Sequence, residues 1–106
     1  MTTATADAWA ALGDPTRRQV LARVAARPSS VTDLARGLPV SRPAVSQHLR
    51  VLHQARLVDV RPRGRQRIYT ARPEGLAALR AELDSFWRQA LANFKHVAEA
   101  TPEEER

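Results

Sequence analysis

Residues 40–69 (VSRPAVSQHLRVLHQARLVDVRPRGRQRIY) carry most of the side chains in this chain that could do chemistry. They hold two of the three histidines and seven arginines, against one carboxylate, Asp59. Histidine can act as a general acid or base or as a metal ligand, and arginine binds phosphates. Three interpretations are therefore open: a catalytic or metal-binding cluster, a solvated basic face, or a surface that binds nucleic acid.

Catalysis is the interpretation that the spacing supports least. A catalytic histidine needs a nucleophile or a carboxylate within hydrogen-bonding reach, and Asp59 is predicted on a strand rather than beside His48 or His53. The sequence has no glycine-rich phosphate loop, no paired carboxylates and no nucleophile motif. Its lack of cysteine excludes disulfides, thiolate metal sites and cysteine nucleophiles. We predict that the protein is not an enzyme and has no cofactor.

The net charge favours phosphate binding by the same stretch. Residues 42–67 contain seven arginines and one aspartate, a net charge of +6, whereas the rest of the chain has ten basic and ten acidic residues. A charge run is often only a solvated face, but such a concentration is also typical of DNA-binding surfaces. No apolar run is long enough for a signal peptide or a membrane span, so we expect a cytoplasmic protein without a membrane partner.

The 106 residues suit one folded domain, which we predict at residues 7–100, between disordered ends at 1–6 and 101–106. A short helix is expected over residues 8–12, where Trp9 and Leu12 share one side. A longer helix begins at the Asp-Pro pair at 14–15, a combination of cap and first-turn proline that starts helices.

Two further helices follow with a short turn between them. Thr32 is expected to cap a helix over residues 33–36, which ends at Gly37, and Ser41 is expected to cap a second, longer helix. That second helix has an apolar face at i, i+4 and i+7 and a polar face opposite. This arrangement predicts a helix-turn-helix with its second helix displayed. The core-facing residues of the second helix are Val45, Leu49 and Leu52.

A basic β-hairpin is predicted after the helix-turn-helix. Residues 57–60 and 67–70 are rich in β-forming side chains, and residues 62–65 form the turn between them. An isolated two-stranded hairpin is not stable in water. We therefore expect this hairpin to pack on the helices.

The last predicted helix begins after Pro73 and carries an apolar stripe about six turns long. A domain of this size cannot cover such a stripe, although packing entirely on its own core is the alternative. We predict that it pairs with the same helix of a second chain. The predicted dimer-interface residues are Trp9, Leu12, Leu79, Leu83, Phe86, Trp87, Ala90, Leu91 and Phe94.

Together the displayed helix and the hairpin suit double-stranded DNA. An α-helix fits the major groove, where arginine can bind guanine and glutamine adenine, while a basic hairpin can follow the backbone. We expect base contacts from Arg42, Ser46 and Gln47, and phosphate contacts from Arg50, His53 and the hairpin. The predicted DNA-binding residues are Ser41, Arg42, Ser46, Gln47, His48, Arg50, His53, Arg61, Arg63, Arg65 and Arg67.

The chain resembles the ArsR/SmtB family of bacterial winged-helix repressors from about Trp9 to Val97. The matching segments are ALGDPTRRQVLARV, TDLARGLPVSRPAVSQHLRVLHQARLV and the wing RPRGRQRIY. The resemblance implies a homodimer that binds an inverted-repeat operator, often its own promoter, with residues 41–53 as recognition helix and residues 61–67 as wing. It also implies a structural or backbone-contacting role for His48.

One residue departs from the family pattern, which usually has glycine after the alanine that closes the recognition helix. Here that residue is Arg56. If the backbone is left-handed at this position, a non-glycine residue costs roughly 1–2 kcal/mol.

Metal binding is common in this family, through cysteines on the first helix of the helix-turn-helix or carboxylates and histidines on the last helix. The cysteine site is impossible here. On the last helix, Asp84, His96 and Glu99 could contribute ligands, but Phe86 stands where a histidine is expected, and the interval from Asp84 to His96 is one residue short. We predict no metal site and a resemblance nearest to the metal-independent, SdpR-like members.

These observations predict a mainly α, winged helix-turn-helix protein with a two-stranded hairpin and a long C-terminal dimerisation helix. The predicted function is that of a homodimeric, sequence-specific DNA-binding repressor or autorepressor. Two alternatives stay open: a metal-responsive repressor with a degenerate zinc site on the last helix, and a winged-helix interaction module that does not bind DNA. The operator, the regulated genes and any effector cannot be read from the sequence.

Overall fold

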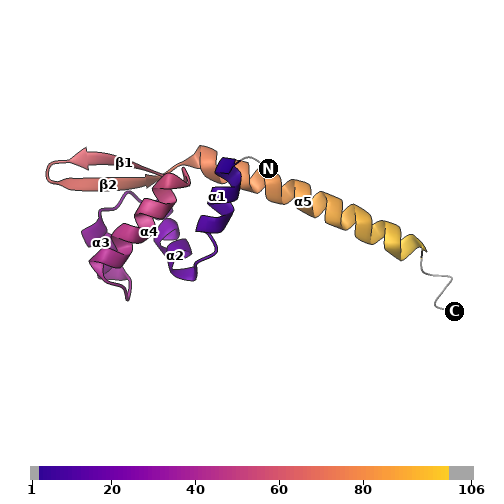
Figure 1. Ribbon diagram of the computed structural model, residues 1–106, viewed down its shortest axis with the longest axis horizontal. Coiled ribbons are helices and arrows are strands. Elements are labelled where there is room, and N and C mark those ends of the chain that lie inside the picture. The colour runs from indigo at the N-terminus through magenta and orange to yellow at the C-terminus, as the bar shows by residue number, and fades with distance from the viewer. Residues whose placement is uncertain (1–2, 101–106) are drawn as a thin grey trace.

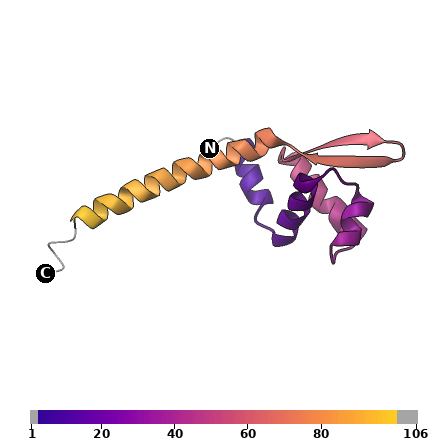
Figure 2. The same ribbon diagram turned by 180° about the vertical axis from the view of Figure 1, so that it is seen from behind.

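The computed structural model describes residues 3–100 and has the predicted winged helix-turn-helix fold. Figure 1 shows a compact helical body, from which a hairpin extends on one side and a long helix on the other, and Figure 2 shows the same arrangement from behind. The elements are α1 (Thr3–Ala11), α2 (Pro15–Ala26), α3 (Val31–Gly37), α4 (Arg42–Gln54), β1 (Val58–Arg63), β2 (Gln66–Ala71) and α5 (Pro73–Ala100).

Helix α1 begins at Thr3, five residues before the predicted start at Ala8, so part of the N-terminal segment expected to be disordered is helical. Alanine is the strongest helix former, and the alanine-rich α1 buries Ala8 and Ala11 in the core. Propensity and packing therefore act together to extend the helix. Residues 1–2 and 101–106, the remaining parts of the predicted disordered ends, lie outside the described residues.

Side-chain caps begin helices α2 and α4 where the sequence predicts them. The Asp14 carboxylate accepts a hydrogen bond of 3.1 Å from the backbone N–H of Arg17. The Ser41 hydroxyl accepts one of 3.2 Å from the backbone N–H of Ala44. Each bond satisfies a donor that the helix itself leaves free.

Helix α3 has a different cap from the one predicted, because Ser30 and not Thr32 opens it. The Ser30 hydroxyl accepts a hydrogen bond of 3.1 Å from the Asp33 N–H, and the Asp33 carboxylate accepts one of 3.3 Å from the Ser30 N–H. This capping box satisfies two backbone donors where a threonine cap would satisfy one. The Ser30 backbone N–H and hydroxyl hold the pKa of Asp33 below its ordinary value.

The core lies where α1–α4, the base of the hairpin and the first turns of α5 meet. Its side chains come from every helix, so the short chain forms one apolar cluster. The most deeply buried large side chains are Val20, Val24, Leu34, Val45, Leu49, Leu52, Leu57 and Val58.

Strands β1 and β2 pair antiparallel from Val58 opposite Ala71 to Arg63 opposite Gln66. The turn is therefore only Gly64 and Arg65, shorter than the predicted turn at residues 62–65. Gly64 has a φ of 63°, which glycine adopts without strain and which two-residue hairpin turns require.

A backbone bridge fixes the hairpin to the helical body. Ser29, in the loop before α3, donates its N–H to the carbonyl of Tyr69 (3.1 Å) and accepts the N–H of Tyr69 (2.8 Å). Strand β2 thus pairs with Ser29 as well as with β1. This bridge holds the hairpin against the helical body, as predicted.

Arg56 between α4 and β1 adopts the left-handed conformation, with a φ of 61°. The tight turn brings its carbonyl oxygen against α5 at Gly75, where a Cβ atom would collide with that oxygen. The absence of a side chain at residue 75 therefore permits the close packing, while Arg56 bears the strain of roughly 1–2 kcal/mol.

Helix α5 contacts the body only through its first turns. Leu79 is buried in the core, and the indole N–H of Trp9 donates to the Glu82 carboxylate at 3.2 Å. Residues 83–99 are exposed except for the half-buried Ala90. Within residues 3–100, no helix combines the length and apolarity that crossing a bilayer requires.

Candidate nucleic-acid interface

Helix α4 turns its apolar side inward and presents polar side chains outward. Val45, Leu49 and Leu52 are completely buried. Their anchoring fixes the rotation of the helix, and hence the direction of the opposite face. The exposed polar side chains of α4 are Arg42, Ser46, Gln47, Arg50, His53 and Gln54.

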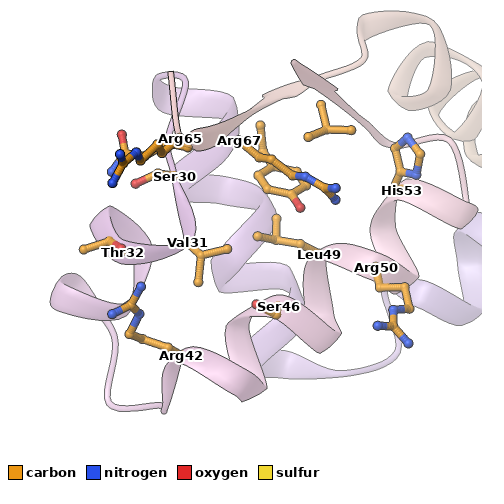
Figure 3. A pocket seen from close by; sticks show the side chains of 13 residues that line it. Ser30, Val31, Thr32, Arg42, Ser46, Leu49, Arg50, His53, Arg65 and Arg67 are labelled. Carbon is orange, nitrogen blue, oxygen red and sulfur yellow. The ribbon is translucent and has the colours of Figure 1, made fainter. Parts of the chain in front are cut away.

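A groove of about 550 Å³ lies between α4 and the hairpin. Figure 3 shows its labelled side chains converging from the start of α3, from α4 and from the hairpin, with Arg42 reaching from the first turn of α4 toward the start of α3. Four arginines line the groove, and no carboxylate among the described residues does. Its lining residues are Ser30, Val31, Thr32, Arg42, Ser46, Leu49, Arg50, His53, Val60, Arg65, Gln66, Arg67 and Tyr69.

The strand register divides the four hairpin arginines between two faces. Residues directly opposite in an antiparallel pair share a face, and alternate residues along a strand do so as well. Arg61 and Arg63 therefore share the face opposite to that of Arg67 and Tyr69, and neither lines the groove, although Gln66, which pairs with Arg63, reaches the groove beside the turn. Arg67 lies on the face that Tyr69 turns to the groove, and Arg65 reaches the groove from the turn.

Asp59, the single carboxylate of the basic stretch, lies at the base of the hairpin and away from its tip. Its Oδ1 is 3.7 Å from Nε of Arg72, whose Nε is also 3.5 Å from Oε2 of Glu74. The carboxylate that could offset the positive groove is thus held by an arginine outside it.

The two histidines of α4 point in different directions. His53 lines the groove, whereas His48 is half-buried on the side facing the start of α2, and its Nδ1 is buried without a hydrogen-bond partner in the described part of the chain. The backbone N–H of Arg17, and to a smaller extent the charge of His48, lower the pKa of Asp14. His48 therefore interacts electrostatically with the α2 cap, Asp14.

The predicted dimer-interface residues separate into two groups. Leu79 is buried in its own core, and Trp9 and Leu12 pack partly buried against that core. Farther along α5, large apolar side chains are exposed, up to 60% for Phe86 and 72% for Phe94. We call this exposed set the α5 stripe: Leu83, Phe86, Trp87, Leu91, Phe94 and Val97.

The candidate metal ligands of α5 do not meet within one chain. Asp84 lies 4.0 Å from Arg80 as an exposed i, i+4 pair. Among residues 3–100, no three histidine, aspartate or glutamate side chains are close enough to hold a metal ion.

Sequence reasoning missed several groove residues, among them Thr32, Gln66 and Tyr69. The spacing of Ser30 and Asp33 fits a capping box and could have placed Thr32 in the first turn of α3, facing the groove. The position of Tyr69 follows from the bridge to Ser29, a tertiary contact without a local sequence signal.

Comparison with known proteins agrees with this architecture. The sequence pattern of the bacterial regulatory protein, arsR family, matches residues 14–60, which run from the α2 cap into β1. The HTH-type transcriptional regulator Rv2034 of Mycobacterium tuberculosis is 55% identical over 93 residues, which are 88% of this chain and 87% of that protein. The chain belongs to the ArsR family. It is a DNA-binding transcriptional regulator and not an enzyme.

Two further members of the ArsR family are similar to the chain. The structure of an ArsR-like transcriptional regulator from Rhodococcus sp. RHA1 has a TM-score of 0.75 at 34% identity, over 90% of this chain and 92% of that one. The transcriptional repressor SdpR of Bacillus subtilis is 33% identical over 54 residues, which are 51% of this chain and 60% of SdpR. The first likeness covers nine tenths of the chain, and the second covers about half of it.

Proposed function

We propose that this regulator is a cytoplasmic, homodimeric repressor that binds an inverted-repeat operator in its own promoter. The observation that carries the proposal is the groove, which combines four arginines, no carboxylate from residues 3–100 and an adjoining exposed helix face. Such a surface attracts a phosphate backbone, and a displayed helix beside it can enter the major groove.

In this proposal one DNA strand runs through the groove between α4 and the hairpin. Arg50, Arg65 and Arg67 neutralise its phosphates and release counterions, which makes the affinity depend on salt. Arg42, Ser46 and Gln47 then select the sequence through base edges. Arg61 and Arg63, on the other face of the hairpin, contribute only long-range attraction.

The α5 stripe supports the homodimer. Apolar side chains as exposed as Phe86 and Phe94 are rarely left in water over so long a surface, and a helix that pairs with its own copy buries them symmetrically. Two recognition helices related by a dyad would then enter successive major grooves roughly 34 Å apart.

The likeness to SdpR and the dispersed acids and single histidine of α5 support regulation without a metal. In that case, the amount of the protein, a partner or a small effector sets the occupancy of the operator. A weak zinc site shared between two copies of His96 and Glu99 is the competing mechanism. It requires that zinc weakens operator binding and that His96→Ala removes this effect.

The proposal is tested by fluorescence anisotropy of the full-length protein on DNA from its own upstream region, across a salt series, with and without zinc. We expect a specific complex at moderate salt that zinc does not weaken. If no upstream fragment is bound in preference to random DNA, the autorepressor proposal is wrong. If Arg65→Ala and Arg67→Ala together leave DNA binding unchanged, the groove is not where the phosphates bind. If the wild-type protein binds neither upstream nor random DNA even at low salt, it is better described as an interaction module.

A further inference from the structure

A second cavity, of about 180 Å³, lies on the far side of α4 from the DNA groove and shares no lining residue with it. It is a depression open to solvent, bordered by α1, the two residues after α4 and the first turns of α5, where the hairpin and α5 join. We call it the joint cavity. Its lining residues are Thr5, Ala8, Ala55, Arg56, Arg72, Glu74, Gly75, Ala78 and Leu79.

Small side chains leave this space open. Three alanines and one glycine face it, and Leu79 is its only large apolar wall. The close contact between Gly75 and the Arg56 carbonyl fixes the backbone on one side, so the helices cannot easily move together to fill the space. An apolar cavity of about 150 Å³ can hold one benzene molecule. The joint cavity is therefore large enough for an apolar group of about one aromatic ring.

Two arginines and one carboxylate, those of Arg56, Arg72 and Glu74, stand at the edge of this apolar space. The Nε of Arg72 is buried, yet at 3.5 Å from Glu74 and 3.7 Å from Asp59 it has electrostatic attraction to both carboxylates and a hydrogen bond to neither. Buried donors in proteins normally have a hydrogen-bond acceptor. The Arg72 side chain as a whole is one third exposed and lines the cavity, as Arg56 does, so a ligand carboxylate can pair with the exposed part of its guanidinium.

We propose that the joint cavity binds a small monocarboxylate with an apolar body of single-ring size, and that its binding weakens the hold on DNA. Arg72 follows β2 directly, and its backbone N–H donates to the carbonyl of Leu57 at 2.9 Å. A carboxylate that engages Arg72 competes with Asp59 on β1 and so disturbs the base of the hairpin. This second part rests on the proposed DNA-binding function, whereas ligand binding itself does not.

Binding is tested on the full-length protein by amide NMR titration with benzoate, benzyl alcohol and benzylamine. We expect saturable shifts for benzoate at Ala8, Arg56 and Leu79, and weaker effects for the alcohol and the amine, which lack the anionic group. If benzoate does not saturate, no carboxylate site exists. If the alcohol binds as tightly as benzoate, the assigned role of Arg72 is wrong.

Two matched variants locate the site. Ala78→Leu places a larger side chain at the cavity, whereas Ala77→Leu makes the same change at the neighbouring exposed position, which does not line it. We expect the first to lose benzoate binding at least tenfold and the second to retain it. Equal binding by both, with unchanged circular dichroism, would place the ligand elsewhere and overturn the proposal.

The coupling is tested by repeating the DNA titration at saturating benzoate. We expect operator affinity to fall roughly fivefold or more, within the usual range for linked sites, in the wild type and in Ala77→Leu but not in Ala78→Leu. Saturable benzoate binding with unchanged DNA affinity would reject the coupling alone. A protein that binds benzoate but no DNA would instead reject the proposed function.

Discussion

The DNA groove and the α5 stripe are both exposed surfaces, yet they differ in what exposure costs. The groove is built from charged side chains that water solvates well, on a floor held by buried residues such as Leu49. The α5 stripe consists of aromatic and aliphatic side chains on a helix that extends beyond the body, as Figure 1 shows. The DNA groove is therefore stable in water without its partner, whereas burial of the α5 stripe lowers the free energy of the protein.

Binding at the two surfaces should therefore depend on different variables. Binding in the groove should depend on salt, because counterions are released from phosphates. Association through the α5 stripe should depend on protein concentration and little on salt, because it buries apolar area. The following variants separate the two surfaces.

The largest effect is expected from a charge in the α5 stripe. Phe86→Asp should prevent dimerisation and weaken operator binding roughly 100-fold or more, since two linked half-sites gain that much from avidity. Ser85→Asp adds the same charge at the adjacent exposed position outside the stripe and should change little. Light scattering after size exclusion, with anisotropy on the operator, measures both quantities. If the Phe86→Asp variant is still a dimer and binds the operator with wild-type affinity, the α5 stripe is not the dimer interface.

A smaller effect is expected from the base-reading side chains of α4. Arg42→Ala and Gln47→Ala should each cost about 2 kcal/mol of discrimination between operator and mutated sites, within the usual range for bidentate base contacts. Gln54→Ala, at the C-terminal end of the same helix and on the side that faces α1 and α2, is the matched control. Competition binding against single-base operator variants measures the discrimination. If all three variants keep it, sequence is read elsewhere.

The two faces of the hairpin provide a finer test. Arg65→Ala with Arg67→Ala should weaken binding to every DNA sequence roughly tenfold and reduce the salt slope by about 0.9 for each lost phosphate contact. Arg61→Ala with Arg63→Ala removes the same charge from the other face and should keep most of the slope. Equal slopes for both pairs would mean that net charge, and not the groove, sets the affinity.

The smallest effect concerns stability alone. Arg56→Gly removes a left-handed strain of roughly 1–2 kcal/mol and adds a backbone entropy cost of roughly 0.5–1 kcal/mol. We therefore expect the free energy of unfolding to rise by up to about 1.5 kcal/mol, measured by urea denaturation. Arg56→Lys keeps the strain and should leave the stability near the wild-type value. A loss of stability in Arg56→Gly would mean that the arginine side chain contributes more than its backbone costs.

Local signals in the sequence were enough for the helices and for the face of α4. Caps such as Asp14 and Ser41 act within four residues, and the apolar spacing of Val45, Leu49 and Leu52 repeats with the helix period, so both can be read directly. Ser30 and not Thr32 caps α3 because Asp33 returns a second hydrogen bond to the Ser30 backbone. A search for single capping residues overlooks this second bond.

The directions of individual side chains could not be read in the same way. Which hairpin arginines face the groove depends on the strand register, and a turn predicted two residues too long leaves that register undefined. His48 and Leu79 lie on helices that were predicted correctly, but their surroundings come from α2 and from the core, which sequence periodicity does not specify.

The bridge between Ser29 and Tyr69 has a consequence for the entropy of DNA binding. Ser29 pairs with the hairpin, and the next residue, Ser30, caps α3, so one short loop sets the distance between the hairpin and the helix-turn-helix. The width of the groove is then fixed before DNA arrives, and less conformational freedom is lost on association. Lengthening this loop by one glycine should therefore reduce operator affinity without removing any side chain that touches DNA.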